Sequence, residues 1–415
     1  MVKIVVKKNV LIYVGGFELP DKNAAAQRVV ANGKIFKELG FEVVYVGIDK
    51  LLPQNIHVED TKSDVYGFDT WAVPYPDSKI SWLKYISSNR YLEYIIENFH
   101  KDRLYGVVCY NYPAVAQYKI KKMCDKKNAL YIADATEWYS SEGGGFLFKI
   151  VKWLDTTARM RVIHLLASGV ITTSKYLSEY YKVRKCKTVE LPTLYDVDAL
   201  NYRASECNRK NNLIKFMYAG SAFNINRVNK NKTNIKDRLD KIIIILNEVY
   251  EQRSNFVLNI FGLTKEGYLE AFPEHEDILD RLTNHIFFHG RKDHSEIIEH
   301  TKCSDFTIFI REIDRVIEAG FPSKFSESIS CGVPVVCNII SNIECYVNQN
   351  NNCFIISLND KSKQINTIKH ILDLNQDEID KMKHYCINNA VFDYRKFIAP
   401  VGRFFQSLDE EIRHG

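Results

Sequence analysis

The chain has 415 residues, which is too long for one ordinary hydrophobic core and predicts two domains. With 46% hydrophobic and 26% charged residues the composition is typical of a globular protein, and no apolar run is long enough to span a bilayer. The net charge of +5 suits an anionic small ligand, but the basic residues form no stripe and accompany no recognition motif, so binding to nucleic acid is not expected.

Short apolar runs alternate with longer amphipathic stretches through the first half of the chain. The runs that we expect to be strands are residues 9–16, 41–47, 104–110, 129–136 and 168–174. Between the first two, residues 24–40 have helical spacing, and Gly40 lies where a helix commonly ends in left-handed backbone. Fully apolar strands that alternate with helices predict a parallel sheet covered on both faces.

The alternation pauses in the polar stretch from Thr193 to Asn212 and then resumes. The later runs that we expect to be strands are residues 214–220, 256–262, 285–290, 306–310, 333–339 and 352–357. We therefore predict an α/β protein with two doubly wound, Rossmann-like domains facing a cleft, where ligands would lie outside the carboxyl ends of the strands. The predicted parts are a first domain at 1–195, a linker at 196–213, a second domain at 214–390 and a C-terminal helix at 391–415 that returns to the first domain.

Residues 318–336, EAGFPSKFSESISCGVPVV, concentrate polar groups at the start of a predicted helix that Gly332 would end. Pro322 is tolerated in a first turn, and Lys324 and Glu327 share a face because they are three residues apart. The free backbone N–H groups and Lys324 suit a phosphate, and Glu327 can accept hydrogen bonds from sugar hydroxyls. In the alternative, which these residues leave equally open, Glu327 only satisfies the helix dipole and pairs with Lys324.

This segment resembles the donor-binding signature of retaining glycosyltransferases with the GT-B fold, the large hexosyl and mannosyl transferase family (family 4-like, polysaccharide biosynthesis type). Further stretches match that family in order. MYAGS (217–221) resembles its first strand and glycine turn, and KDRLDKII (236–243) resembles a helix whose lysine meets the donor diphosphate. FFHGRKDHSEI (287–297) resembles a loop whose arginine lies near the donor, and DFTIFIRE (305–312) resembles the strand before the signature.

The resemblance implies a role for each matching residue. The implied catalytic residues are Lys236, Arg291 and Glu318. The implied donor-binding residues are Gly220, Ser221, Gly320, Phe321, Pro322, Ser323, Lys324 and Glu327, of which Glu327 would hold the ribose.

Two departures from the family pattern matter. The family pairs two glutamates with seven residues between them, and the first would fall on Ala319. Either the loop shifts so that Glu318 reaches the transferred sugar, or backbone groups of Gly320 and Phe321 do that work. The basic insert at 222–234 is longer than in the family; we interpret it as a solvated loop, or as a lid if it folds over the cleft.

The first domain carries fewer matches, as expected of a domain that binds a variable acceptor. Gly15 and Gly16 resemble the family's glycine turn near the donor sugar and diphosphate. Asp134 and Glu137, in DATEWYSSEGGG, resemble a D-x-x-E-W segment and are candidates to orient an acceptor hydroxyl, although they can equally cap a helix. Arg28 is either a family position or a surface helix residue, and Ser174 is expected to be a helix cap.

Taken together, the resemblance implies transfer of a hexose from a nucleoside-diphosphate sugar to a hydroxyl of a glycan or lipid-linked oligosaccharide, in surface polysaccharide assembly. It implies retention of configuration and neither a metal nor another cofactor, and the clustered histidines lack the spacing of a metal site. The scattered cysteines form no CxxC, so we expect no disulfide framework and a cytoplasmic location, with peripheral membrane contact through KIVVKK left open.

Two alternatives from other classes stay open. A nucleotide-sugar epimerase on the same fold would need acid and base groups that face the donor sugar, and few are evident here. A non-catalytic nucleotide-sugar-binding partner subunit is kept open by the alanine at position 319.

Overall fold

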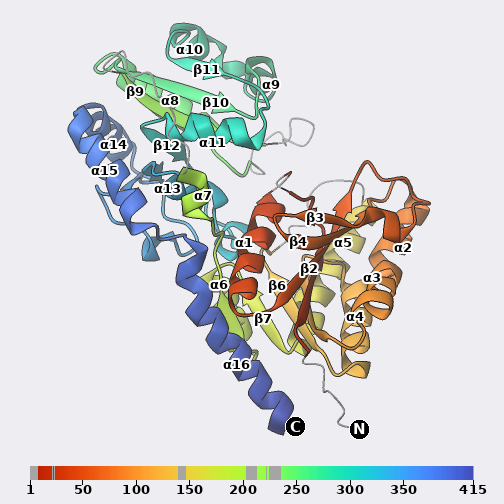
Figure 1. The fold of residues 1–415 in the computed structure, drawn as a ribbon. Helices are drawn as coiled ribbons and strands as arrows, with labels where there is room; N and C mark the ends of the chain where they lie inside the picture. Colours follow the sequence, from red (N-terminus) through yellow and green to blue (C-terminus); the bar gives the residue numbers. More distant parts are fainter. Residues whose placement is uncertain are drawn as a thin grey trace, which may run out of the picture. The chain divides into compact units, whose positions relative to one another are not determined.

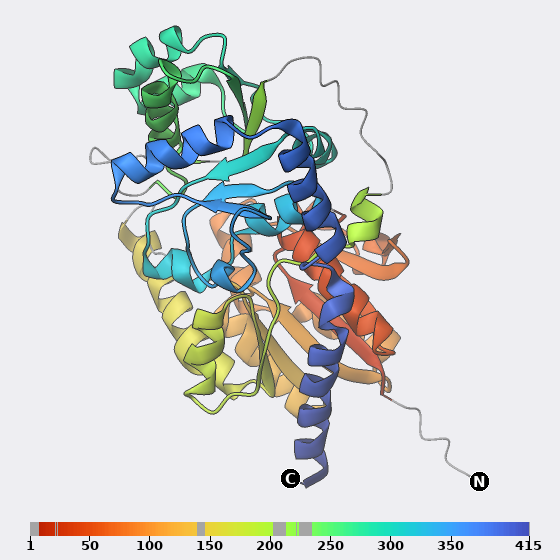
Figure 2. The same ribbon diagram turned by 90° about the vertical axis from the view of Figure 1, so that its left-hand side faces the viewer.

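The computed structural model describes residues 8–20, 22, 24–138, 146–201, 213–220, 222–223 and 235–414, and Ser221 and most of the 222–234 insert lie outside them. The chain divides into two compact units (Figures 1 and 2). The first unit is Met1–Leu194 with Ala319–Phe321 and Tyr394–Gly415, and the second is Tyr195–Glu318 with Pro322–Asp393.

The first unit is built on an eight-stranded sheet with the order β3-β4-β2-β1-β5-β6-β7-β8. All neighbours pair in parallel except β3 and β4. The strands are β1 (Val10–Gly15), β2 (Glu42–Asp49), β3 (Ser63–Val65), β4 (Phe68–Pro74), β5 (Leu104–Tyr110), β6 (Leu130–Ala135), β7 (Gly169–Thr172) and β8 (Thr188–Glu190). The five strands predicted for this half are present, and β3, β4 and β8 were not predicted.

Helices cover both faces of this sheet (Figure 1). They are α1 (Ala24–Glu38), α2 (Lys79–Ser87), α3 (Arg90–Ile95), α4 (Ala114–Lys126), α5 (Phe146–Ala158), α6 (Lys175–Lys182) and α16 (Ile398–His414). Shorter turns are η1 (Val58–Thr61), η2 (Ile96–His100), η3 (Arg159–Ile163), η4 (His164–Leu166) and η8 (Tyr394–Phe397). Helix α1 packs with α16 on one side, and α4 packs with α2 and α5.

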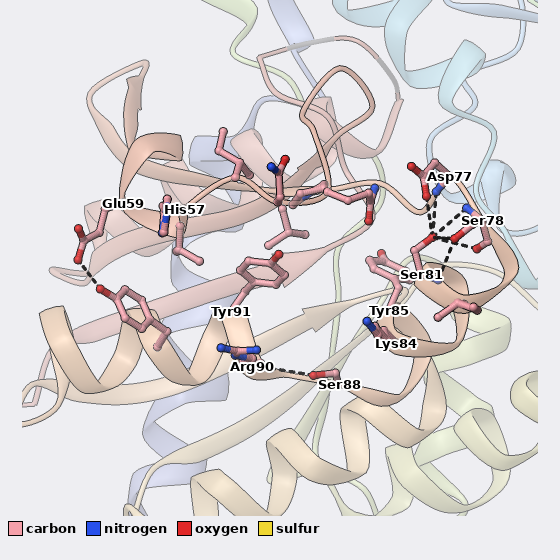
Figure 3. A pocket seen from close by; sticks show the side chains of 18 of the residues that line it. His57, Glu59, Asp77, Ser78, Ser81, Lys84, Tyr85, Ser88, Arg90 and Tyr91 are labelled. Atoms are coloured by element: carbon pink, nitrogen blue, oxygen red, sulfur yellow. Dashed lines mark hydrogen bonds between the residues drawn. The ribbon is translucent and has the colours of Figure 1, made fainter.

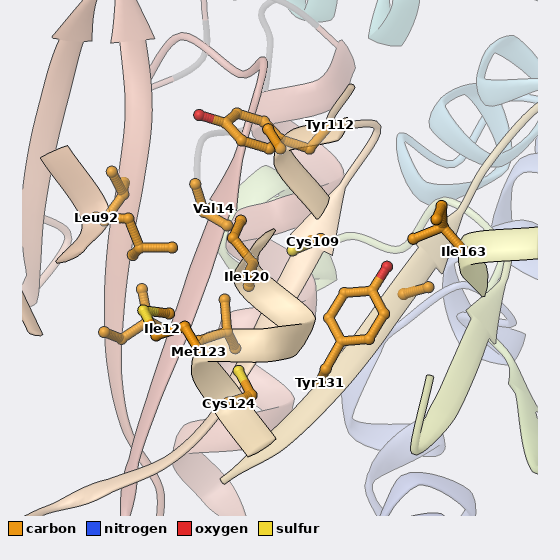
Figure 4. Close-up of a cluster of buried hydrophobic side chains, with 14 of the residues drawn as sticks. Ile12, Val14, Leu92, Cys109, Tyr112, Ile120, Met123, Cys124, Tyr131 and Ile163 are labelled. Atoms are coloured by element: carbon orange, nitrogen blue, oxygen red, sulfur yellow. The ribbon is translucent and has the colours of Figure 1, made fainter. Parts of the chain in front are cut away.

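The core of the first unit lies between the sheet and helix α4. Figure 4 shows Ile12 and Val14 from β1 together with Ile120 and Met123 from α4, and Tyr131 from β6 lies beside them. All of these side chains are buried, as expected for a parallel sheet covered by helices. The core therefore fixes the carboxyl ends of the central strands, where a site is expected.

The second unit is built on a six-stranded parallel sheet with the order β11-β10-β9-β12-β13-β14. Its strands are β9 (Ile214–Ala219), β10 (Phe256–Phe261), β11 (Ile286–Phe288), β12 (Phe306–Phe309), β13 (Val335–Cys337) and β14 (Cys353–Ile355). All six match strands predicted from the sequence. Together the two parallel sheets confirm the predicted α/β fold class.

The helices of the second unit also pack on its sheet. They are α7 (Val197–Asn201), α8 (Leu239–Tyr250), α9 (Lys265–Ala271), α10 (Glu276–Arg281), α11 (His294–Lys302), α12 (Arg315–Ala319), α13 (Ser323–Ser330), α14 (Lys361–Leu372) and α15 (Gln376–Asn389), with the turns η6 (Pro273–His275) and η7 (Ile343–Cys345). Helix α8 packs against α14 and β12, while α11 and α13 pack against β9 and β13.

Two further observations bear on the sequence predictions. No helix in the described part of the chain is both long and apolar enough to cross a membrane. Cys109, Cys124, Cys337 and Cys353 are among the free thiols, as expected, whereas Cys303 is disulfide-bonded, which the sequence did not predict.

Candidate functional site

The strand order of the second unit places a topological switch point between β9 and β12. From β9 the chain builds outward to β10 and β11 on one side, and then returns to β12, β13 and β14 on the other. In open parallel sheets a ligand crevice lies at such a point, outside the carboxyl ends of the strands. Four of the motifs predicted from the sequence, those ending at residues 221, 243, 312 and 336, meet around these two strands.

A buried carboxylate, Asp237, organises the polar groups at this point. It lies between β9 and α8, its side chain is 1% exposed, and Tyr218 Oη donates to its Oδ2 at 2.8 Å. Lys324 Nζ, from α13, donates to the same oxygen at 2.8 Å. Arg311 Nε, which follows β12, donates to Oδ1. One acid therefore holds two cations that come from different elements.

The charges of this cluster do not cancel. Burial alone would raise the pKa of Asp237, but Lys324 and Arg311 hold that pKa well below its ordinary value. Burial lowers the pKa of Lys324, an effect that Asp237 opposes. Burial, and then Asp237, raises the pKa of the Tyr218 phenol well above its usual range. With Asp237 ionised and both partners protonated, the cluster carries one net positive charge.

Glycine turns let the chain approach Lys324 closely. Gly220 follows β9 with φ +137°, and a Cβ atom built there would lie 2.5 Å from Lys324 Nζ. Gly262 follows β10 with φ +94°, and a Cβ there would lie 2.7 Å from the carbonyl oxygen of Gly220. Gly262 also donates its N–H to the carbonyl of Gly290, after β11, at 2.7 Å. Side chains at Gly220 or Gly262 would push these turns apart.

Helix α13 presents its N-terminus and Glu327 beside this cluster. Its N-cap residue is Pro322, whose side chain makes no capping hydrogen bond to the first turn. Glu327 is one turn further on, and its Oε2 lies 2.9 Å from His294 Nε2 and 3.3 Å from Tyr195 Oη. The predicted alternative in which Glu327 pairs with Lys324 is not found, because Lys324 is bound to Asp237 instead.

Glu318 and Ala319 differ from what a glutamate pair would require. Glu318 Oε1 accepts the backbone N–H of Ser341 at 2.9 Å, so its carboxylate is tied to the loop after β13. Ala319 is fully buried among the hydrophobic residues of the first unit, and its carbonyl accepts the Ser174 hydroxyl at 2.7 Å. A glutamate side chain would not fit at position 319 without displacing that packing.

The other residues predicted for the donor differ in exposure. Lys236 and Arg291 are exposed, and neither is ion-paired within the described residues. Lys236 nevertheless lies close enough to Lys324 to lower the pKa of that lysine further, after burial and Arg311. Gly320, Phe321 and Ser323 are half-buried around the start of α13. Ser221 lies outside the described residues.

In the first unit, Asp134 and Arg28 form a buried ion pair. Arg28 donates from Nε and Nη2 to the two carboxylate oxygens of Asp134 at 3.1 and 2.7 Å, and from Nη1 to the carbonyl of Leu191 at 2.6 Å. Tyr13 Oη also donates to Asp134. Burial opposes the charge of Arg28, but Asp134 raises its pKa overall. This geometry favours a structural role for Asp134 over the predicted contact with an acceptor, and Arg28 is buried rather than on a helix surface.

The other residues predicted for the first unit lie at the carboxyl edge of its sheet; they are Gly15, Gly16 and Glu137. A Cβ atom at Gly15 would lie 2.3 Å from the carbonyl oxygen of Tyr110, so β1 and β5 need a glycine there. Gly16 is half-buried after β1, and Glu137 is half-buried after β6. Ser174 accepts the N–H of Leu177 at 3.3 Å at the start of α6, which confirms the predicted helix cap.

A large pocket opens at the same edge of the first unit (Figure 3). Its volume is about 880 Å³, which is within the range of small-molecule sites. Val73 and Pro74 at the end of β4, and Tyr112 after β5, form part of its wall. Figure 3 shows Tyr85 and Tyr91 among the side chains that line it, with Lys84 and Arg90 nearby. A Cβ atom at Gly16 would lie 3.8 Å from Tyr85 Oη, so the pocket adjoins the predicted glycine turn.

The acids that line this pocket already have partners. Glu59 accepts the phenol of Tyr94, and Asp77 accepts the Ser81 hydroxyl at 3.0 Å. The pocket therefore offers hydroxyl, phenol and cationic groups rather than free carboxylates. Sugars are commonly held by such a mixture of aromatic faces and hydrogen-bonding groups.

Sequence reasoning missed Asp237, Arg311, Tyr218, His294 and Tyr195 as members of the candidate site. Asp237 and Arg311 lie inside the quoted motifs, directly after Lys236 and β12, but only the fold shows that they meet. No group of three or more His, Cys, Asp or Glu side chains within the described part of the chain could hold a metal ion.

Comparisons with known proteins agree with this architecture. Residues 226–391 match the family model described as glycosyl transferases group 1.

A sucrose-phosphate synthase from Thermosynechococcus elongatus is 11% identical with a TM-score of 0.63, and the match covers 97% of this chain and 100% of that one. A trehalose 6-phosphate synthase from Burkholderia multivorans is 8% identical with a TM-score of 0.66 (98% and 99% covered). Anabaena HepE, solved with UDP and glucose, is 12% identical with a TM-score of 0.59 (96% and 100% covered). No curated protein matches the sequence significantly. At these identities the structural likeness establishes the GT-B fold alone.

Proposed function

We propose that this chain, which carries a glycosyl transferases group 1 domain within a GT-B fold, moves a hexose from a nucleoside-diphosphate sugar to a hydroxyl of a glycan or lipid-linked oligosaccharide. We also propose that the anomeric configuration is retained and that the product belongs to a surface polysaccharide. The observation that carries the proposal is the cationic cluster at the β9–β12 switch point, beside the N-terminus of α13.

The leaving group explains why this cluster matters. When the bond between the anomeric carbon and the diphosphate oxygen breaks, negative charge develops on the diphosphate. Lys324 is fixed by Asp237, so its charge is positioned before the reaction and needs no reorganisation. The N–H groups at the start of α13 add the positive end of a helix dipole. Lys236 and Arg291, both exposed in the second unit, are further cations that we propose to contact the diphosphate.

Glu327 is suited to bind the ribose. Its Oε2 is held by His294 and Tyr195, which fixes the orientation of the carboxylate. No hydrogen bond from the described residues reaches Oε1, which is then available to a ribose hydroxyl. In nucleotide-binding sheets an acid in this place commonly binds the ribose.

We propose that the positive groups of the protein take the place that a metal ion has in other transferases. Lys324, Arg311, Lys236 and Arg291 supply the charge that a divalent cation would otherwise bring to the diphosphate. No protein nucleophile is needed in the step that we propose. The acceptor oxygen bonds to the anomeric carbon on the face that the diphosphate leaves, and the acceptor proton passes to the departing phosphate oxygen.

The pocket of the first unit is the proposed acceptor site. Its volume and its tyrosine and hydroxyl lining suit a saccharide, and its wall includes the carboxyl end of β4 and Tyr112, which follows β5. Glu137 follows β6 and is not among the residues that line the pocket. We propose that it, rather than the fully engaged Asp134, orients the acceptor hydroxyl, because no described residue donates a hydrogen bond to it.

An activity screen tests this proposal. The chain would be incubated with UDP-, GDP- and ADP-hexoses, with and without glycan fragments and short-chain polyprenyl-diphosphate saccharides, and released nucleotide and product anomer would be measured. We expect acceptor-dependent release and an unchanged anomeric configuration. Lys236→Ala should lower the rate by at least about a hundredfold, while Lys381→Ala, at an exposed lysine of α15, should not. An epimerised donor without acceptor, or inversion, would contradict the proposal.

A further inference from the structure

Helix α5 and the turn η3 that follows it leave a row of large apolar side chains uncovered. Trp153 is 56% exposed and Leu154 is 53% exposed, and Ile150, Val151 and Val162 are exposed as well. Removing such side chains from water is favourable. A cluster of uncovered side chains on one helix is therefore expected to mark an interaction surface rather than ordinary scatter.

Helices α2 and α4 extend this row. None of the nine residues of α2, KISWLKYIS, is buried, and its Ile80 and Leu83 are strongly exposed. Val115 and Tyr118, one turn apart on α4, are exposed too. Helix α2 packs against the unit through Tyr85, while Leu83 is left on the surface and Ile80 lies at the edge of the pocket described above.

The three helices adjoin one another through specific contacts. The N–H of Ala114 at the start of α4 donates to Asp155 of α5 at 2.8 Å, and Lys119 of α4 donates to the carbonyl of Ser87 at the end of α2 at 2.5 Å. The three helices are therefore neighbours, and we call their exposed residues together the α2–α4–α5 face; α2 and α4 can be followed in Figure 1.

The charge of this face is strongly positive. Helices α2, α4 and α5 with η3 contain ten lysines and arginines, of which Arg159 is buried, and two aspartates; the nine cations outside the core exceed the aspartates by seven, whereas the whole chain has a net charge of +5. Both acids are engaged, Asp155 with the N–H of Ala114 and Asp125 with Lys121 at 2.6 Å. The cations that surround the apolar residues therefore outnumber the acids that could neutralise them.

We propose that the α2–α4–α5 face binds the surface of an anionic phospholipid bilayer. The apolar side chains would enter the boundary between headgroups and acyl chains, where Trp153 is well suited because tryptophan favours that depth. The lysines would lie against the phosphates, each contributing to attraction by the negative surface. A protein partner or a second copy could also cover apolar residues, but an excess of cations spread over three helices selects an extended anionic surface. The proposal goes beyond sugar transfer and does not rest on it.

Vesicle flotation with the full chain tests this proposal. We expect the protein to float with vesicles of phosphatidylcholine mixed with phosphatidylglycerol, to float far less with phosphatidylcholine alone, and to be released by high salt. Leu154→Glu should weaken binding by at least about tenfold, and Lys149→Glu by at least about fivefold at low salt. The control is Val183→Glu, which places the same charge at an 81% exposed valine outside this face and should bind as the wild type does.

Three results would overturn the proposal. The first is that the wild type does not float with anionic vesicles at low salt. The second is that Leu154→Glu and Val183→Glu lose the same amount of vesicle binding. The third is that the chain self-associates without lipid and that Leu154→Glu abolishes this self-association. The last would assign the face to a second copy of the chain. Circular dichroism of each variant checks that the fold is intact, which is expected because the substituted side chains are exposed.

Discussion

Asp237 shows how one buried acid sets the properties of its neighbours. It is covered almost completely, and it holds Lys324 and Arg311 in fixed positions beside the carboxyl ends of β9 and β12. A buried charge without partners is costly, so the cluster is stable only as a set. The acid is therefore as important for the proposed diphosphate site as the lysine that would touch the ligand.

Removing Asp237 should be strongly destabilising. Asp237→Ala leaves two cations near one another without the carboxylate that compensates them, and we expect a loss of about 3–5 kcal/mol in the free energy of unfolding. Urea denaturation followed by circular dichroism measures this. The control Asp377→Ala, at an exposed acid on α15, should change stability by less than about 0.5 kcal/mol. A loss for Asp237→Ala of under about 1 kcal/mol would contradict the described network.

His164 predicts a dependence of stability on pH. Burial, and then Arg159, lowers the pKa of His164 to about 3, and its Nδ1 lies 2.7 Å from Tyr181 Oη. Because the unfolded state binds the proton near pH 6.5 and the folded state does not, this contribution is fully present above that pH and is lost as pH falls toward 3. Between pH 7 and pH 5 the loss should be about 2 kcal/mol.

The variant His164→Gln isolates this effect, because glutamine keeps a polar group but does not titrate. We expect the variant to be less stable than the wild type at pH 7, and its stability to fall less than that of the wild type between pH 7 and pH 5. The free energy of unfolding in urea at both pH values measures the difference. Parallel losses in the two proteins would show that His164 does not carry this pH dependence.

At the scale of elements, the glycine turn after β9 controls the position of Lys324. Gly220→Ala introduces a side chain at φ +137° and places its Cβ against the lysine ammonium. We expect a stability loss above about 1 kcal/mol and a nucleotide affinity that falls at least about tenfold. The control Gly40→Ala shares the left-handed backbone, at φ +88°, but its Cβ meets no atom within 4 Å. It should lose stability without losing nucleotide affinity, as calorimetric titration would show.

Strands could be predicted from the sequence where a run of apolar residues was uninterrupted. The strands with long apolar runs, such as β1, β5 and β9, were identified because buried parallel strands are apolar on both faces. Strand β4 was missed because polar Asp69 and Thr70 interrupt its apolar run. Strands β3 (SDV) and β8 (TVE) were missed because each has a single valine among polar residues, whereas the equally short β11, β13 and β14 are apolar throughout and were predicted.

The candidate site was predictable only in part, for a physical reason. Lys324 and Glu327 could be proposed because helix spacing puts them on one face. Their actual partners, Asp237 and His294, lie 87 and 33 residues away along the chain and meet them only through the sheet topology. Conversely, Asp134 looked like a ligand group in sequence, but the fold buries it against Arg28.

At the scale of the whole molecule, one chain carries two candidate sites. The second unit has the cationic cluster at its β9–β12 switch point, and the first unit has a pocket large enough for a saccharide. Each candidate site lies at the carboxyl ends of strands of its own sheet, and the site in the second unit lies where the strand order reverses. The first unit also carries the cationic, apolar α2–α4–α5 face. A transferase that extends a lipid-linked glycan would need a donor site, an acceptor site and access to a membrane surface, and these three features supply candidates for each.

The most direct test of the central claim is a titration of the full chain with UDP, GDP and ADP, and with their hexose derivatives, while its thermal stability is followed. A ligand that binds only the folded state at a hundred times its Kd stabilises that state by about 2.7 kcal/mol. We predict that one nucleotide family raises the melting temperature of the wild type and of Lys381→Ala, and that Glu327→Ala and Lys236→Ala reduce the rise strongly. If no nucleotide raises it, or if Glu327→Ala and Lys236→Ala respond as the wild type does, the donor site is not where we place it.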